Sequence, residues 1–268
     1  MRKFIRLMLT ALLAISVAVG ATACAVPGGE TGDLAAVQAA DKLVVGVTIY
    51  EPMDYIDDEG EWTGFDAELA KMFAEELGVN CQIVIITWGQ KVAELDSKQI
   101  DLVWNGMTAS EDLGKEIDFS VSYAKNAQVA VVKADSNITT KDQIKAARVA
   151  VEDGSAGQTQ AVENGMTTIN PVAAQVDALN EVTAGTSDVA IIDITMAQSV
   201  VGKGDYADLK IVDGVSYGDE VFAVGLRKGS DLKAKLDAFL KEKYADGTMA
   251  ALAEKYSVGI NTEALGAE

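Results

Sequence analysis

The residues best suited to chemistry lie between Asp101 and Ser120, where an apolar run passes into a short polar segment that contains Asn105, Gly106 and Thr108. Amide and hydroxyl groups of this kind can bind a polar molecule through hydrogen bonds. Open α/β sheets form their binding crevices outside the carboxyl ends of the strands. The stretch therefore predicts a ligand-binding loop at the end of a parallel strand.

The composition excludes several kinds of catalytic and metal site. The chain contains no His, which excludes an imidazole base, a His metal ligand and a Ser-His-Asp triad. It also lacks the glycine pattern of a Walker phosphate loop. The densest acidic run, Asp57 to Glu59, is followed by Gly60 and is interpreted as a surface turn rather than a metal site. We therefore expect no cofactor, no metal and no catalytic residue.

Short apolar runs alternate with amphipathic stretches along most of the chain. In the stretch 65–77, apolar residues recur at every fourth position and charged residues face away, as in a helix that covers one side of a sheet. The predicted strands are 43–49, 82–86, 102–104, 128–132, 149–151, 189–192 and 221–226, and the predicted helices are 65–77, 90–95, 140–147, 172–183, 232–244 and 249–256, with one more opened by 154–157. This alternation predicts an α/β fold with mainly parallel pairing, in one large domain or two smaller ones.

The N-terminus predicts an exported protein. Three basic residues precede an apolar run over 7–19, and small residues follow up to Cys24, which is the pattern of a secretory signal peptide over residues 1–23. The run is shorter than the ~20 apolar residues that a membrane-spanning helix needs. Residues 21–24 resemble a bacterial lipoprotein cleavage box in which Cys24 is lipidated, with ordinary secretion and a retained anchor as alternatives. Residues 24–40 are small and polar and predict a flexible tether, so we expect the folded body to begin near Asp41.

The charge balance narrows the choice of partners. The formal net charge is -19, and removal of residues 1–23, which hold three basic and no acidic residues, leaves about -22. Such a surface repels nucleic acid and disfavours a strongly anionic ligand. If Cys24 carries lipid, Cys81 is the only thiol left, and we expect it to be a small core residue.

Four segments in a fixed order carry a family resemblance. They are 64–70, 101–120, 185–193 and 227–231. Together they resemble the family 3 extracellular solute-binding proteins of bacterial ABC importers, of the polar amino-acid type, over nearly all of residues 41–258. The resemblance implies a two-lobed, periplasmic-binding-protein-like fold with two hinge-crossing strands, which closes on its ligand. Lobe 1 would contain residues 41–128 and 222–268, and lobe 2 would contain residues 129–221.

The resemblance also implies roles for the polar-loop and aromatic residues. Tyr50 and Trp88 stand where two rings sandwich the ligand, and a cation against such a ring gains about 0.5–2 kcal/mol. Core filling is the alternative for both rings, and Trp104 is expected in the core. Asn105, Gly106 and Thr108 match the loop that offers backbone groups and a hydroxyl to the amino-acid head, with the glycine permitting close approach.

In lobe 2 the resemblance implies contacts for both charged groups of an amino acid, its carboxylate and its ammonium. Ser155 and Ala156 match a loop whose amides, at a helix start, receive a carboxylate; a plain helix cap is the alternative. Asp193 matches the acidic residue that binds the ligand's ammonium. It ends an apolar run, where an unpaired carboxylate would be costly, and a local cap is the alternative role.

The chain departs from the family at one informative position. Where Leu113 stands, amino-acid-binding members usually carry an Arg that grips the ligand carboxylate in a two-pronged pair. Glu152 stands where some relatives carry Lys, and Glu220 lies on the second crossing strand, so these three are further candidate contacts. Lys115 would replace the Arg only if the local helix were reset. Two interpretations stay open: a zwitterion held by amides near Ser155 and Thr108, or a cationic ligand. Both favour a polar or cationic amino acid, or a related amine, over a dicarboxylic one.

The resemblance finally implies a role and partners. We expect a monomeric, non-enzymatic lipoprotein, anchored to the outer face of the cell membrane, that binds a small-molecule ligand and delivers it to ABC permease subunits. A ligand-presenting sensor is one alternative. A cyclohexadienyl-dehydratase-like enzyme is another, in which Glu152 or Asp193 would serve as acid or base.

Overall fold

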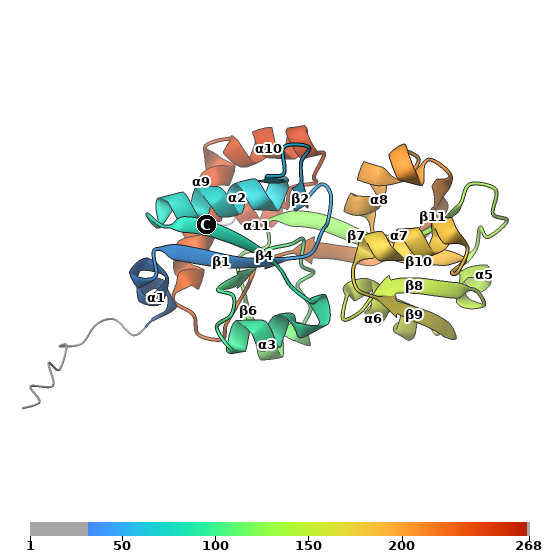
Figure 1. The fold of residues 1–268 in the computed structure, drawn as a ribbon, viewed down its shortest axis with the longest axis horizontal. Coiled ribbons are helices and arrows are strands. Elements are labelled where there is room, and N and C mark those ends of the chain that lie inside the picture. The colour runs from blue at the N-terminus through green and yellow to red at the C-terminus, as the bar shows by residue number, and fades with distance from the viewer. Residues whose placement is uncertain (1–31, 267–268) are drawn as a thin grey trace, which may run out of the picture. The chain divides into compact units, whose positions relative to one another are not determined.

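The computed structural model describes residues 32–266 (Figure 1). The predicted signal peptide, the lipidation of Cys24 and the first part of the predicted tether lie outside the described residues. Among the described helices, none is both long enough and apolar enough to cross a membrane.

Two five-stranded sheets form the framework of the described chain. The first has the order β4 (Asn80–Ile85), β1 (Lys42–Val47), β5 (Leu102–Val103), β12 (Gly225–Leu226) and β6 (Asp118–Phe119), and the second has the order β11 (Leu209–Phe222), β7 (Ala124–Lys133), β10 (Val189–Asp193), β8 (Arg148–Glu152) and β9 (Thr168–Val172). A small hairpin pairs β2 (Tyr55–Ile56) with β3 (Trp62–Thr63). Strands β4, β1 and β5 are parallel, as are β10, β8 and β9, but β12, β6, β7 and β11 pair antiparallel. The pairing is thus mixed rather than mainly parallel.

Helices pack on both sheets. They are α1 (Asp33–Ala39), α2 (Phe65–Glu76), α3 (Lys91–Asp96), α4 (Leu113–Glu116), α5 (Lys141–Lys145), α6 (Ala156–Glu163), α7 (Gln175–Ala184), α8 (Ile194–Val200), α9 (Leu232–Ala245), α10 (Thr248–Tyr256) and α11 (Thr262–Leu265), with short 3₁₀ turns at η1 (Trp88–Gln90) and η2 (Gly204–Tyr206). Helix α2 matches its prediction because its apolar residues recur with the helical period, and Phe65, Leu69 and Phe73 are fully buried. Trp104 is buried against Phe73 as expected of a core residue.

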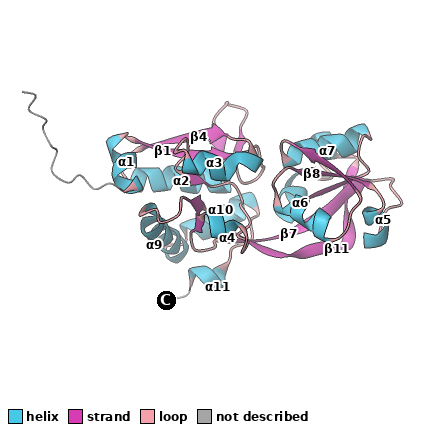
Figure 2. Cartoon of the chain, turned by 90° about the horizontal axis from the view of Figure 1, so that it is seen from below, coloured by secondary structure: helices cyan, strands magenta, loops and turns pink. Residues whose placement is uncertain are grey.

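Two long strands connect the sheets. Strands β7 and β11 pair antiparallel from Ala124 with Phe222 to Lys133 with Leu209, and Figure 2 shows them running together into the second sheet. Where Ala124 begins β7 and Phe222 ends β11, Ala124 bridges to Ile260 and Phe222 bridges to Thr108. Strand β6 lies just before β7 in the chain and β12 just after β11, and both belong to the first sheet. The result is the predicted α/β fold of two lobes. The exact lobe boundaries stay a prediction.

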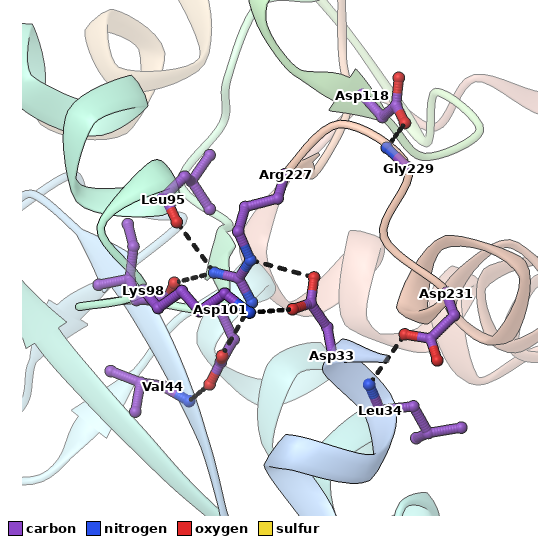
Figure 3. A network of polar contacts seen from close by, with 11 residues as sticks. Asp33, Leu34, Val44, Leu95, Lys98, Asp101, Asp118, Arg227, Gly229 and Asp231 are labelled. Carbon is purple, nitrogen blue, oxygen red and sulfur yellow. Dashed lines mark hydrogen bonds and ion pairs between the residues drawn. The ribbon is translucent and has the colours of Figure 1, made fainter. Parts of the chain in front are cut away.

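Helix α1 corrects one expectation. Residues 24–40 were predicted to be a flexible tether, yet 33–39 form a helix whose Val37 is 2% exposed. Asp33 at its start accepts a hydrogen bond from the buried Arg227 guanidinium at 3.0 Å, and the Leu34 N–H donates to Asp231 at 2.9 Å (Figure 3). The alanines between them favour a helix, and Leu34 and Val37, three residues apart, reach the core from one face. The folded body therefore begins before residue 41.

A second correction concerns residues 168–174. The predicted helix 172–183 begins only at Gln175, because residues 168–172 form strand β9 at the edge of the second sheet. In the sequence, Pro171 argued against a strand here, since proline is tolerated in strands only at edges and bulges. Helix α8, directly after β10, was also not predicted from the sequence.

Candidate ligand-binding site

A cavity of about 1050 Å³ is lined by residues of both lobes. All the candidate contacts lie in its lining: Tyr50, Trp88, Asn105, Gly106, Thr108, Leu113, Glu152, Ser155, Ala156, Asp193 and Glu220. The structure thus brings together residues that are far apart in the chain. Their individual environments decide what each can do.

Asn105 holds the polar loop in place. Its side-chain oxygen accepts from both the N–H and the hydroxyl of Thr48 at 2.9 Å, and its amide nitrogen donates to the Thr48 carbonyl and to Asp54 at 3.0 and 2.8 Å. Because every one of these partners is internal, the Asn105 side chain positions the loop. It has little hydrogen-bonding capacity left for a ligand.

Gly106 lets the loop pass beneath the Tyr50 ring. Its φ is +53°, and a Cβ placed there would lie 2.7 Å from Tyr50 Cε1. Its N–H donates to the Asp66 carboxylate at 2.7 Å, and the Tyr123 hydroxyl donates to the same oxygen at 2.7 Å. Burial raises the pKa of Asp66 to about 7. Glycine at this position therefore allows the loop to pack closely against the Tyr50 ring. The Gly106 N–H already binds Asp66 and is not free to bind a ligand.

Thr108, Glu220 and Asp193 form one connected polar cluster with two amides of strand β7. Thr108 Oγ1 donates to Glu220 Oε2 at 2.9 Å. The Gln128 amide donates to Glu220 at 3.0 Å and to Asp193 at 2.6 Å, and the Asn126 amide donates to Glu220 at 3.1 Å and also to Asp193. Two carboxylates therefore share their donors, which leaves negative charge in the cavity for a cationic group.

The pKa and the hydrogen bonds of Asp193 follow from its buried surroundings. It is 4% exposed, and burial, followed by the neighbouring Glu220 carboxylate, raises its pKa to about 7. Gln175 donates to its second oxygen, and the Asp193 N–H donates back to Gln175 Oε1 at 2.9 Å. Its side chain makes no cap bond to α8. The local-cap alternative for Asp193 is therefore wrong.

The amides of Asn126, Gln128 and Gln175 were missed in the sequence. Asn126 and Gln128 are two residues apart on β7 and hence share one face of the strand, so two long polar side chains with a period of two were a signal in an otherwise apolar strand. Gln175 begins α7 and gave no comparable local signal.

The two aromatic rings have different surroundings. Tyr50 is 1% exposed and packs edge-on against Phe222, with ring centroids 6.4 Å apart, and burial raises its pKa well above the usual value. Trp88 is 6% exposed, and the Lys91 ammonium lies 4.7 Å from the centroid of its ring. One face of Trp88 is therefore already covered by a cation from the same chain.

Lys91 is a buried cation in the site that the sequence did not reveal. Its side chain is 7% exposed and donates to the Trp88 carbonyl at 3.2 Å and to the Gly154 carbonyl, in the loop before α6, at 3.0 Å. Burial lowers its pKa, and the Glu152 carboxylate acts in the opposite direction. Its position near the start of a short amphipathic helix gave no signal of burial, because lysines are mostly exposed.

Glu152 ends strand β8 inside the cavity. It is 3% exposed, its Oε1 has no hydrogen-bond partner, and burial raises its pKa to about 8. In the loop that follows, Ser155 caps α6 by accepting the Gln158 N–H at 3.1 Å. Its hydroxyl is thus used as in the plain-cap alternative, and the polar groups that Ala156 has for a ligand are those of its backbone.

The cations at the cavity rim do not replace the Arg that the family carries at the position of Leu113. Leu113 is half-buried at the start of α4. Lys115 is 66% exposed and pairs with Asp112 at 2.6 Å, so it faces solvent. The described lining holds nine acidic residues and three lysines. This excess favours a ligand with positive charge.

In the described part of the chain, no group of three or more acidic or Cys side chains is arranged to hold a metal ion.

Comparison with known proteins gives the family. Residues 43–259 match the model of bacterial extracellular solute-binding proteins, family 3. The chain is 32% identical to the L-cystine-binding protein TcyJ of Escherichia coli (strain K12), with 85% of this chain and 86% of the relative covered. It is 28% identical to the arginine-binding extracellular protein ArtP of Bacillus subtilis (strain 168), with 97% and 99% covered.

A solved structure agrees with the sequence relatives. The chain is similar to the P235GK mutant of ArgBP from T. maritima, with a TM-score of 0.79 and 30% identity over 83% of this chain and 98% of the other. Family model, relatives and fold all point to one group. The chain belongs to the bacterial extracellular solute-binding proteins, family 3.

Proposed function

We propose that this protein is the substrate-binding component of an ABC importer for a small polar or cationic amino acid or a related amine. The observation that carries the proposal is the cluster of buried Asp193 and half-buried Glu220, whose carboxylates share the amide donors of Asn126 and Gln128 at one wall of the cavity. A ligand ammonium placed there would form charge-assisted hydrogen bonds, which are stronger than neutral ones. The relatives named for cystine and arginine binding support this ligand class.

Calorimetric titration of the mature protein tests the ligand class. The panel is arginine, lysine, histidine, cystine, glutamine and glutamate, after removal of any ligand that co-purifies, which mass spectrometry would identify. We expect a basic or neutral polar amino acid to bind most tightly, because acidic residues outnumber lysines in the lining. Tightest binding to glutamate would reject this proposal.

We propose further that the protein is a monomer, held to the outer face of the cell membrane by lipid on Cys24, and that it delivers its ligand to permease subunits without turning it over. Cys24→Ser should then release the protein from the membrane fraction. Permease and ATPase genes beside its own gene would favour import over a sensor role. Turnover of prephenate or arogenate by the protein, followed by the absorbance of the aromatic product, would instead reveal a dehydratase.

A further inference from the structure

The proposed ligand raises a question of charge. An amino acid has a carboxylate, but Leu113 stands where the family's Arg would hold it, and the rim Lys115 is turned to solvent with Asp112. Amide groups at the start of α6 offer only about half a positive charge. An anionic group in a cavity with nine acidic lining residues needs a stronger partner.

Lys91 lies beside the place where those amides point. Its ammonium is 3.0 Å from the carbonyl of Gly154, two residues before the first residue of α6. The first N–H groups of a helix have no partner within the helix. Ser155 Oγ accepts the N–H of Gln158, and the N–H groups of Ala156 and Gly157 have no partner among the described residues. An ammonium and free amides thus converge on one end of the cavity.

The Lys91 ammonium also has hydrogen-bonding capacity left. A lysine carries three N–H donors, and those of Lys91 reach two carbonyl oxygens among the described residues, Trp88 O and Gly154 O. The other two lysines of the described lining, Lys115 and Lys125, are 66% and 53% exposed and lie near Asp112 and Glu263. Lys91 is therefore the buried cation of this cavity, with one donor to spare.

Glu152 does not cancel this charge near neutral pH. Its carboxyl is buried and one oxygen has no partner, and burial raises its pKa to about 8. A protonated Glu152 is neutral and does not offset the Lys91 charge. The Glu116 and Asp153 carboxylates also raise the pKa of Lys91, but among the described residues the ammonium bonds only to two carbonyl oxygens. A ligand carboxylate that entered here would be the first carboxylate to bind that ammonium directly.

We propose that Lys91 takes over the role of the missing Arg: it holds the ligand carboxylate between its ammonium and the first amides of α6. The ligand is then an α-amino acid rather than an amine. The inference rests on the proposed function and deepens it. It makes Lys91, which spans the cleft to Gly154, the residue that discriminates between ligands with and without a carboxylate.

The test uses matched ligand pairs on the mature protein. Each pair is an amino acid and its decarboxylated amine: arginine and agmatine, histidine and histamine, cystine and cystamine. For whichever amino acid binds, we expect the wild type to prefer it over its amine by at least about tenfold. Lys91→Met should weaken amino-acid binding by about 10- to 100-fold, as for a lost charge-assisted bond, and leave the amine nearly unaffected.

Three further variants keep the test sharp. Lys91→Gln keeps a donor for Gly154 without the charge and should lose the preference, whereas Lys91→Arg should retain most of it. Lys115→Met is the matched control, a lysine of the same cavity lining that faces solvent, and should change neither affinity.

The following outcomes would contradict the proposed role of Lys91. If Lys91→Met and Lys91→Gln weaken amino acid and amine equally, Lys91 is only a structural link between the lobes and the inference is wrong. It is equally wrong if Lys115→Met abolishes the preference. If the wild type binds no amino acid of the panel, the proposed function itself fails, and the inference with it.

Discussion

Arg227 is the residue whose removal should destabilise the protein most clearly. It is 9% exposed in its side chain and donates to Asp33 at 3.0 Å, Asp101 at 3.2 Å, and the carbonyls of Leu95 and Ile100 at 3.1 and 2.6 Å (Figure 3). Arg227→Met keeps much of the apolar stem but removes a buried charged donor from two carboxylates and two carbonyls. Asp33 keeps the more distant Lys98 ammonium, and Asp101 keeps the Val44 N–H. Breaking a buried pair in this way costs about 3–5 kcal/mol.

The expected change in melting temperature follows from that loss. In a domain of this size, each kcal/mol lowers Tm by about 2–4 °C, so Arg227→Met should lower it by about 6–20 °C. Calorimetry or circular dichroism of the mature protein measures the change. Hydrogen exchange should show the loss of protection concentrated in α1, because Asp33 begins that helix.

Arg148 provides a matched control in the second lobe. It also reaches four acceptor oxygens, two on Asp188 and the carbonyls of Gly185 and Thr186, but the paired side chains are 50% and 38% exposed. Exposed ion pairs contribute little, so Arg148→Met should leave Tm nearly unchanged. Equal losses in the two variants would show that the number of hydrogen bonds, rather than burial, sets the effect, and would refute this reasoning.

Three further predictions concern the site. Asp193→Asn removes a charged acceptor worth about 1.5–3 kcal/mol and should weaken ligand binding by about 10- to 150-fold in calorimetry; unchanged affinity would place the ammonium elsewhere. Gly106→Ala meets both a left-handed φ and the Tyr50 ring at 2.7 Å, whereas Gly214→Ala meets only the φ, since nothing lies within 4 Å there; urea unfolding should therefore show the larger loss for Gly106→Ala. Burial raises the pKa of Glu152 from 4.5 to about 8, so the folded protein binds more protons than the unfolded chain between these values and its stability falls as pH rises through them, by up to about 1.4 kcal/mol per pH unit. Glu152→Gln should flatten this pH dependence of Tm, and an unchanged slope would contradict the assignment.

The fold was largely predictable because its signals are local. The helical period of Phe65, Leu69 and Phe73 and the apolar run before Asn105 require no knowledge of distant residues. Elements whose stability comes from partners far along the chain were missed. Helix α1 is short, and its partners are distant in the chain: Arg227 lies 194 residues from Asp33, and Asp231 lies 197 residues from Leu34.

The same distinction divides the site. The strand-end position of Asn105 and Thr108, together with the family resemblance at Asp193, predicted that these residues would line one site, and all three line one cavity. Which of their groups remain free depends on distant residues: Thr48 occupies the Asn105 side chain, and Glu220 occupies the Thr108 hydroxyl. Lys91 illustrates the limit most clearly, because its burial is created by a loop 63 residues later. No local pattern could distinguish it from an ordinary surface lysine.

The attachment of α1 also has a mechanical consequence. Its polar partners, Arg227, Asp231 and Lys98, all belong to the first lobe, whereas the second lobe is reached mainly through β7 and β11. A pulling force on the chain from its N-terminal side would therefore act on the first lobe rather than on the second. If lipid on Cys24 anchors the protein to a membrane, we expect the first lobe to stay fixed and the lobe that carries Asp193 and the α6 amides to move when the cleft closes.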